Sequence, residues 1–460
     1  MISGKLHNVR AITADSRAVQ PGFMFAALPG VKVDGRKYIA EAVARGAVAV
    51  LAQEGTLWPP GVPPRPMMLA ANPRAKLAEL AVELAGKLPE CLVAVTGTNG
   101  KTSTVDFLRQ IFAAAGRKAA SLGTLGVIAE GFPPTGSLTT PDPVTLATTL
   151  AELARAGITH AALEASSHGI EQCRLDGLSF AAAGFTNLTR DHLDYHGSMD
   201  AYRAAKLRLF DTLLPRGTPV LAMADMDPET LAQLRAIAAQ RGLDFRPISI
   251  ERTVPLPSGQ EIFTAGQRVI LNLPGRFQAD NAVLAAGLAQ ACGVADALSY
   301  LPRLQGVRGR LECALVLPGG AAAYVDYAHT PDAISRVLSA LRPHAHGKLV
   351  AVIGAGGDRD AGKRPLMGEA AAQGADEVIV TDDNPRSEEP AAIRAAILAA
   401  CPNATEIGDR RAAIAAGLAR LAPGDVLVVA GKGHEQGQIV GSQTLPFDDA
   451  AVIRELGEAA

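Results

Sequence analysis

One glycine-containing loop has the residue types and spacing that bind nucleotide phosphates. Residues 96–102 read TGTNGKT and match the pattern G-x-x-G-K-[ST]. Glycines let backbone amides close around phosphate oxygens, and a following helix adds its positive end. Lys101 would reach the terminal phosphates, and the Thr102 hydroxyl would bind magnesium. The full Walker pattern needs one more glycine where this chain has Val95, so the match is partial.

Two later segments combine carboxylates with imidazoles. Glu164 lies in LEASSHG and His192 in TNLTRDHLDYHG, each near the end of a predicted strand. Such a pair can hold a hard metal ion beside phosphates. Two alternatives stay open: ordinary polar loop residues, and a metallohydrolase cluster, although no H-E-x-x-H pattern is present. By composition alone, Lys206 in AYRAAKLRLF is a solvent-exposed helix lysine.

A third group of polar tips follows strand-like segments near the end of the chain. These tips are GAGGDRD (354–360), DNPR (383–386) and GKGHE (431–435). Arg359, Arg386 and Glu435 can converge on one zwitterionic ligand, although each alone is typical of a surface loop. Arg359 also stands where G-x-G-x-x-G needs its third glycine, so a dinucleotide-dependent oxidoreductase is a weak alternative.

Short apolar segments and alanine-rich helices must position these tips. CLVAVT (91–96) predicts a buried strand, and Val105, Leu108 and Phe112 recur on one helical face after the loop. From about residue 311, further apolar segments alternate with helical stretches. This pattern predicts the α/β class with mostly parallel sheets and ligands at the strands' carboxyl ends. We predict a small N-terminal α/β domain (1–88), a central P-loop-like ATPase domain (89–311) and a Rossmann-like doubly wound domain (312–460).

Composition limits the class of protein. Of 460 residues, 48% are hydrophobic and 20% charged, so buried cores are expected and wholesale disorder is not. With 44 basic and 46 acidic side chains, a general nucleic-acid-coating protein is disfavoured. Five scattered cysteines, no signal peptide and no long apolar run predict a cytoplasmic protein without a membrane span. We expect a monomer.

Taken together and in this order, the motifs resemble those of the Mur ligases, nearly from end to end. The segments that carry the resemblance are ADSR (14–17), DGRKYI (34–39), TGTNGKT, TTPD (139–142), LEASSHG, TNLTRDHLDYHG, AYRAAK, GRFQADNA (275–282), GVRGRLE (306–312), VDYAHTPDA, GGDRDAGKRPLMG, DNPR and AGKGHE. One departure is Val31-Lys32 after Gly30, where some relatives have a histidine. It leaves the contacts to the uridine end open.

The resemblance implies a role for each matched position. ATP would be bound by Gly97, Thr98, Asn99, Gly100, Lys101, Thr102, Ser103, Asn281, Arg310, Asp326 and His329. Magnesium would be bound by Thr102, Glu164, His192 and Lys206, the last as a carbamate (N6-carboxylysine). The UDP-N-acetylmuramoyl dipeptide would be held by Ser16, Thr139, Thr140, Ser166, Gln172 and Arg174. The incoming amino acid would be held by Arg359, Asp383, Asn384, Pro385, Arg386, Gly431 and Glu435.

The resemblance also implies a reaction. ATP would activate the D-glutamate side-chain carboxylate of UDP-N-acetylmuramoyl-L-alanyl-D-glutamate as an acyl phosphate, and an amine would then form the amide. Arg386 can grip the far carboxylate of meso-2,6-diaminopimelate, which lysine lacks, so we expect diaminopimelate. The alternatives are the same ligation with L-lysine, a folylpolyglutamate-synthase-like ligase, and a non-enzymatic nucleotide-binding regulator.

Overall fold

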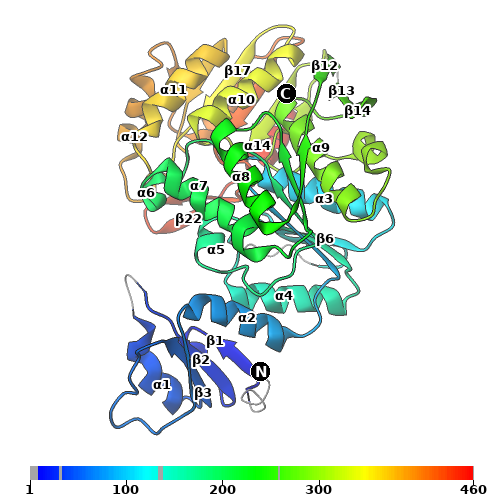
Figure 1. Cartoon of the computed structure of the whole chain (residues 1–460). Helices are drawn as coiled ribbons and strands as arrows, with labels where there is room; N and C mark the ends of the chain where they lie inside the picture. The colour runs from blue at the N-terminus through cyan, green and yellow to red at the C-terminus, as the bar shows by residue number, and fades with distance from the viewer. Residues whose placement is uncertain (1–8, 31–33, 133–137, 257–258, 459–460) are drawn as a thin grey trace.

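The computed structural model describes residues 9–30, 34–132, 138–256 and 259–458. The Val31-Lys32 position lies outside these ranges. Three α/β units follow one another along the chain, each built on its own sheet (Figure 1). Each sheet lies wholly within one of the three predicted domain ranges. The borders near residues 88 and 311 stay a prediction.

The first sheet is parallel throughout, in the order β1-β2-β3-β4. Alternate residues of its strands face opposite sides: Met24 and Leu51 pack under α2, whereas Phe25 and Val50 pack under α1. The unit contains β1 (Ala11–Thr13), η1 (Ser16–Ala18), β2 (Phe23–Ala27), η2 (Gly35–Tyr38), α1 (Ile39–Ala44), β3 (Ala49–Gln53), β4 (Met67–Ala70) and α2 (Pro73–Ala85).

The second sheet is the largest, with seven strands in the order β11-β10-β9-β5-β8-β6-β7. Only the edge pair β6–β7 is antiparallel. The sheet contains β5 (Cys91–Thr96), β6 (Ala119–Gly123), β7 (Gly126–Ala129), β8 (His160–Glu164), β9 (Ala182–Phe185), β10 (Pro219–Met223) and β11 (Asp244–Ile248).

Nine helical segments surround that sheet, and α2 of the first unit packs on α4 (Figure 1). They are α3 (Lys101–Ala114), α4 (Pro143–Arg155), α5 (Ser167–Glu171), α6 (Leu193–His196), α7 (Met199–Arg208), η3 (Leu209–Leu213), α8 (Pro228–Arg241), α9 (Arg276–Ala291) and η4 (Ala297–Arg303). A small antiparallel sheet of β12 (Arg252–Leu256), β13 (Gly259–Thr264) and β14 (Gln267–Leu271) completes the unit.

The third sheet has the order β15-β16-β20-β17-β18-β19 and is parallel except for the edge pair β15–β16. Helices cover both faces, with separate apolar cores on each side. The strands are β15 (Glu312–Val316), β16 (Ala322–Asp326), β17 (Leu349–Ile353), β18 (Glu377–Val380), β19 (Thr405–Glu406) and β20 (Val426–Ala430).

The remaining elements of the third unit are five α-helices, a short 3-10 helix and a hairpin. They are α10 (Pro331–Leu341), η5 (Arg342–His344), α11 (Lys363–Gly374), α12 (Pro390–Leu398), α13 (Arg410–Leu418), β21 (Gly437–Val440), β22 (Gln443–Pro446) and α14 (Asp449–Glu458). The predicted α/β class with mostly parallel sheets is confirmed. Within the described residues, we find no helix whose length and apolarity would let it span a membrane.

Candidate active site

The glycine loop joins β5 to α3, as the sequence predicts. Gly100 precedes the helix with a φ of 86°, and a Cβ there would overlap the Asn281 carboxamide on α9. The Lys101 ammonium donates hydrogen bonds to the carbonyls of Gly97 (2.9 Å) and Thr98 (2.8 Å). Burial lowers the pKa of Lys101, and the nearby Glu164 carboxylate opposes this shift. The cation therefore lies over the predicted phosphate loop.

Lys206 on α7 is buried, with 1% of its surface exposed. Its Nζ donates to the Gly97 carbonyl at 2.8 Å and lies 4.4 Å from the centroid of the Tyr202 ring. Burial and the positive charge of Lys101 lower the pKa of Lys206 well below its ordinary value. The expectation from composition, a solvent-exposed lysine, is therefore wrong, because Lys206 lies against the phosphate loop.

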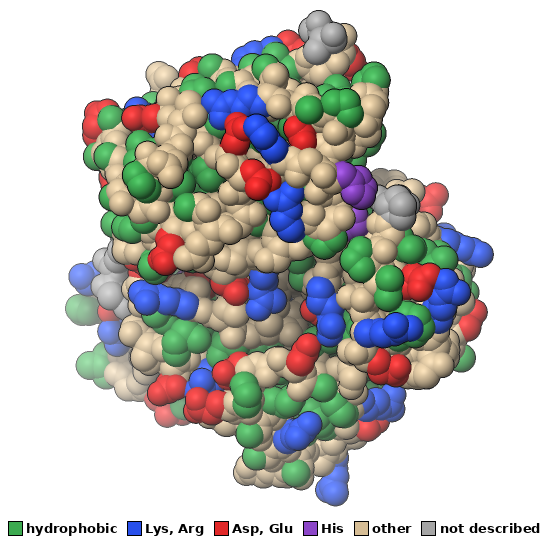
Figure 2. All heavy atoms as spheres, turned by 90° about the horizontal axis from the view of Figure 1, so that it is seen from above, with side chains coloured by type: hydrophobic (Ala, Val, Ile, Leu, Met, Phe, Trp, Pro, Cys, Tyr) green, Lys and Arg blue, Asp and Glu red, His purple; other side chains and the backbone are tan. Residues whose placement is uncertain are grey.

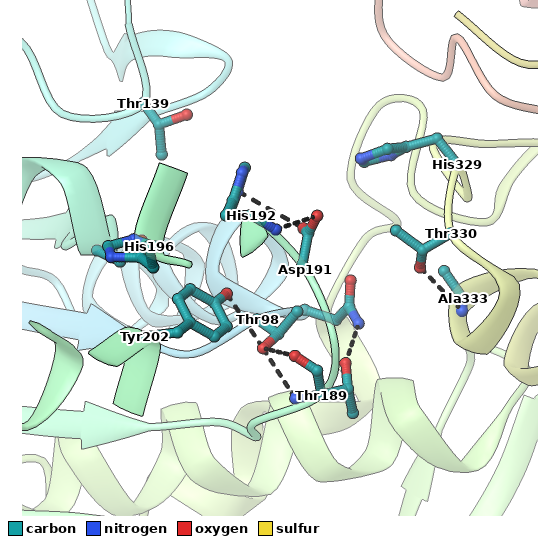
Figure 3. Close-up of polar contacts among 12 residues, drawn as sticks. Thr98, Thr139, Thr189, Asp191, His192, His196, Tyr202, His329, Thr330 and Ala333 are labelled. Atoms are coloured by element: carbon teal, nitrogen blue, oxygen red, sulfur yellow. Dashed lines mark hydrogen bonds and ion pairs between the residues drawn. The ribbon is translucent and has the colours of Figure 1, made fainter. Parts of the chain in front are cut away.

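Glu164 and His192 approach the loop from two different segments. Glu164 ends β8, and its carboxylate accepts hydrogen bonds from the Thr124 amide (2.8 Å) and hydroxyl (3.2 Å). His192 lies beyond the end of β9, at the start of α6, and has a φ of 54°. Its Nε2 is 3.5 Å from the Asp191 carboxylate, as Figure 3 shows. Partial burial, together with the charges of Lys101 and Lys206, lowers the pKa of His192 to about 4, so the ring is neutral near pH 7.

The donor set suits magnesium only if phosphate oxygens complete it. Among the described residues, no three His, Cys, Asp or Glu side chains are grouped to hold a metal ion. Glu164, His192 and the Thr102 hydroxyl supply few protein ligands. Magnesium in nucleotide sites is commonly bound by one or two carboxylates plus phosphates and water.

Three further predicted nucleotide-binding residues lie between positions 310 and 329 of the chain. Arg310 Nη2 donates to the Thr102 hydroxyl at 3.3 Å, and the buried Arg310 Nε has no hydrogen-bond partner among the described residues. Asp326 accepts from the amides of Leu311 (2.6 Å) and Ala328 (2.8 Å), and burial raises its pKa to about 6. In Figure 3, His329 lies across from Asp191 and His192.

Predicted site residues line two cavities, and Arg174 lines both. The first, of about 880 Å³, lies against the N-terminal sheet and is lined by Ser16, Arg17, Arg74, Gln172 and Arg174 among others. The second, of about 670 Å³, joins the central and third units. Its predicted lining residues are Thr139, Thr140, Ser166, Arg174, His192, His329, Arg359, Asp383, Asn384, Arg386, Gly431 and Glu435. The structure thus groups these twelve predicted residues around the second cavity and places Ser16 and Gln172 at the first.

Hydrogen bonds join several of the residues predicted to bind the dipeptide. Arg174 donates to the Thr140 carbonyl (2.5 Å) and to Gln172 Oε1 (2.8 Å). Thr140 and Ser166 hydroxyls lie 3.0 Å apart, and Thr140 also donates to the Glu164 carbonyl at 2.8 Å. In the first cavity, the Ser16 hydroxyl donates to Glu41 at 2.9 Å. Arg174, which lines both cavities, thus forms hydrogen bonds with Gln172 of the first cavity and Thr140 of the second.

The amino-acid candidates lie at the carboxyl ends of β17, β18 and β20. Arg386 has a φ of 54°, and its Nη1 donates to the Gly357 carbonyl at 2.7 Å. Asn384 Nδ2 donates to Glu435 Oε2 at 2.7 Å. A Cβ on Gly431 would crowd the Asp383 carboxylate, so this position needs glycine. Pro385 is buried beside Arg386.

Sequence reasoning missed two charged residues of this region, Lys363 and Lys432, and named Asp191 only as part of the Asp- and His-rich segment TNLTRDHLDYHG. Lys363 and Asp191 line the second cavity, and Lys432 is fully buried beneath it. Lys363 and Lys432 stand inside the motifs GGDRDAGKRPLMG and AGKGHE, so those motifs held the signal. The second cavity is lined by both basic and acidic side chains. Figure 2 shows basic and acidic side chains interspersed over the upper face of the molecule.

Comparison with known proteins agrees with this arrangement along the whole chain. Residues 8–80 match the model "Mur ligase family, catalytic domain", residues 95–289 "Mur ligase middle domain", and residues 309–433 "Mur ligase, glutamate ligase domain". A UDP-N-acetylmuramoyl-L-alanyl-D-glutamate--2,6-diaminopimelate ligase of Caulobacter vibrioides is 54% identical over 96% of this chain and 94% of its own. The Rhizobium meliloti protein of the same name is 52% identical over 97% and 94%.

Two solved structures are also similar to this chain. One, also described as a UDP-N-acetylmuramoyl-L-alanyl-D-glutamate--2,6-diaminopimelate ligase, has a TM-score of 0.71, 32% identity and coverage of 98% and 95% of the two chains. A folylpolyglutamate synthase of Mycobacterium tuberculosis, complexed with ADP and AMPPCP, has a TM-score of 0.66 at 19% identity over 84% and 94%, which shows a shared fold alone. On its own sequence, site geometry and full-length similarity, the chain belongs to the Mur ligase family.

Proposed function

We propose that the chain joins meso-2,6-diaminopimelate to the D-glutamate side-chain carboxylate of UDP-N-acetylmuramoyl-L-alanyl-D-glutamate, with ATP consumed. The observation that carries this proposal is the full-length similarity to relatives whose names state these substrates. The reaction is an amide ligation and a step of peptidoglycan synthesis.

The nucleotide would occupy the space around the glycine loop. Gly100 lets the loop backbone pass close to the Asn281 carboxamide, and Arg310 carries a buried Nε without a partner among the described residues. Lys101 can exchange its two backbone carbonyl acceptors for phosphate oxygens. The remaining candidates are Gly97, Thr98, Asn99, Thr102, Ser103, Asn281, Asp326 and His329.

Magnesium would fit beside this loop, where Thr102, Glu164 and His192 would hold it together with phosphate oxygens. When bound, it would neutralise charge on the phosphate groups. Lys206 is suited to carbamylation because burial and the nearby Lys101 lower its pKa well below its ordinary value, which favours the neutral, nucleophilic amine. The carbamate would convert a cation into an oxygen ligand next to Gly97.

The chemistry would proceed in two balanced transfers. The glutamate carboxylate attacks the γ-phosphorus of ATP, the bond to the bridging oxygen breaks, and ADP leaves. The neutral amine of diaminopimelate then attacks the acyl carbonyl, inorganic phosphate leaves, and the amine loses its proton. Lys101 would stabilise the transferred phosphoryl group by its charge. Arg174 and Thr140 would orient the dipeptide, since they are joined by a hydrogen bond at the cavity wall.

The third unit would bind the amino acid whose amine forms the amide bond. Arg386 and Arg359 line the cavity with Glu435 and Asn384, a set that complements a ligand with both carboxylate and ammonium groups. L-Lysine, the alternative amine donor, offers no second carboxylate to Arg386. A folate substrate is disfavoured because the likeness to folylpolyglutamate synthase lies at 19% identity.

The product identifies the reaction directly. Purified protein incubated with ATP, magnesium, the UDP-dipeptide and meso-diaminopimelate should yield a UDP-tripeptide, read by mass spectrometry. Absence of that product, or the same product yield with L-lysine, would refute the assignment of the amino acid.

A further inference from the structure

Lys432 is buried directly behind the amino-acid candidates, with no exposed surface. Its Nζ donates to Asn384 Oδ1 (3.0 Å), Glu435 Oε2 (3.3 Å) and the Gly437 carbonyl (2.5 Å). A lysine ammonium has three hydrogen atoms to donate, so these three acceptors saturate it. Lys432 therefore has no donor left for a substrate.

Asn384 has its amide orientation fixed by the same group. Its Oδ1 accepts from Lys432 and from the Ile439 amide at 2.9 Å, so its Nδ2 must face away from both donors. There it donates to Glu435 Oε2 at 2.7 Å.

Glu435 is consequently held by one oxygen only. Oε2 accepts from both Asn384 and Lys432, whereas Oε1 has no hydrogen-bond partner among the described residues. Glu435 lines the second cavity and is about one-third exposed. Lys432 also lies 4.0 Å from Asp383, so it offsets a second carboxylate at this wall.

We propose that Lys432 is a positioning residue for the amino-acid site: it ties Asn384 and one oxygen of Glu435, leaving Glu435 Oε1 to accept the ammonium group of the incoming amino acid. This inference rests on the proposed function. It assigns the carboxylate and the ammonium group at the far end of diaminopimelate to Arg386 and Glu435, and it makes their spacing depend on a buried lysine that never touches the ligand.

Lys432→Met tests the proposal, because methionine fills similar volume without donors or charge. The KM for diaminopimelate should rise by about tenfold or more, the effect of weakening one charged hydrogen bond. The KM values for ATP and the UDP-dipeptide, and kcat at saturation, should stay within about twofold. Lys348→Met, which removes an exposed lysine paired with Glu377, is the matched control and should leave all KM values unchanged.

A purely structural role would give another pattern. It would lower the melting temperature and the active fraction while leaving the KM for diaminopimelate unchanged, and this result would overturn the proposal. A parallel rise of all three KM values would also overturn it. Lys432→Gln, which keeps two N–H donors, is the second variant should Lys432→Met fail to fold, and it should show the same selective rise in smaller degree.

A double-mutant cycle of Lys432→Met and Glu435→Gln tests whether Lys432 acts through Glu435. If Lys432 acts through Glu435, the two substitutions together should raise the KM for diaminopimelate by less than the product of their separate effects. Independent effects would contradict this route. Wild-type turnover with diaminopimelate is measured first, because its absence refutes the proposed function rather than the role of Lys432.

Discussion

At the scale of single residues, the carbonyl of Gly97 accepts hydrogen bonds from two lysines of different helices, Lys101 and Lys206. Two ammonium groups so close together repel, and the proximity of Lys101 lowers the pKa of Lys206 in addition to burial. Conversion of Lys206 to a carbamate would remove this repulsion. The same reaction would create an oxygen ligand for magnesium.

Lys206→Arg should therefore reduce kcat by about a hundredfold or more. Arginine keeps the positive charge but cannot form the carbamate that would bind magnesium. Wild-type protein should carry the added mass of one carbon dioxide at Lys206 under bicarbonate, measured by gentle intact-mass spectrometry. A variant with wild-type kcat would contradict this role.

Arg386→Ala should reduce the preference for diaminopimelate over L-lysine by about ten- to a hundredfold, because the far carboxylate loses its charged partner. The ratio of kcat/KM for the two amines measures this preference. Arg411→Ala, which removes an exposed arginine paired with Glu455, is the control. An unchanged ratio in Arg386→Ala would contradict the role of Arg386 in selecting diaminopimelate over L-lysine.

His434 should make the fold sensitive to acid. Burial, with the nearby charges of Arg310 and Arg308, lowers the pKa of His434 to about 3. The unfolded imidazole binds a proton as pH falls below about 6.5, while the folded one stays neutral, so stability is lost as pH falls from about 6.5 towards 3. Between pH 7 and 5, His434→Gln should lose less unfolding free energy than wild type, by at most about 2 kcal/mol in urea titrations. Equal losses would argue against this assignment.

At the scale of elements, the strands and the polar loops after them could be predicted. Short apolar segments bounded by glycine, proline or charged residues are typical of buried strands. CLVAVT forms β5 and DVLVVA contributes β20. The burial of Lys206 could not be predicted, since it depends on where α7 packs against a loop about a hundred residues earlier. The contacts of Lys432 could not be predicted for the same reason, because its partner Asn384 lies 48 residues earlier in the chain.

The turn from β5 into α3 offers a matched pair of substitutions. Gly100 and Gly116 flank the same helix with similar φ values, 86° and 77°, but a Cβ at Gly116 meets open space. Gly116→Ala should cost only the backbone penalty, about 1–2 kcal/mol, and leave the KM for ATP unchanged. Gly100→Ala should cost more in unfolding free energy and raise the KM for ATP, because the methyl group crowds Asn281. Equal effects of both substitutions would contradict the role of Gly100 in the loop.

At the scale of the whole molecule, three sheets present their polar tips to two cavities that share Arg174. Resemblance to a family predicted which residues form one site, and twelve of them line the second cavity. The resemblance assigns Ser16 and Arg386 to different ligands, and they line different cavities. The packing of the N-terminal unit on α4 through α2 could not be predicted from the motifs. This layout would place the nucleotide sugar at one end and the amine at the other.

The most direct test of the proposed ligation is phosphate release from ATP by the purified protein. Release should require both UDP-N-acetylmuramoyl-L-alanyl-D-glutamate and meso-diaminopimelate, and L-lysine in place of diaminopimelate should support it at least about tenfold less well. Release without either substrate, equal release with L-lysine, or release with folate and glutamate would contradict the proposed reaction.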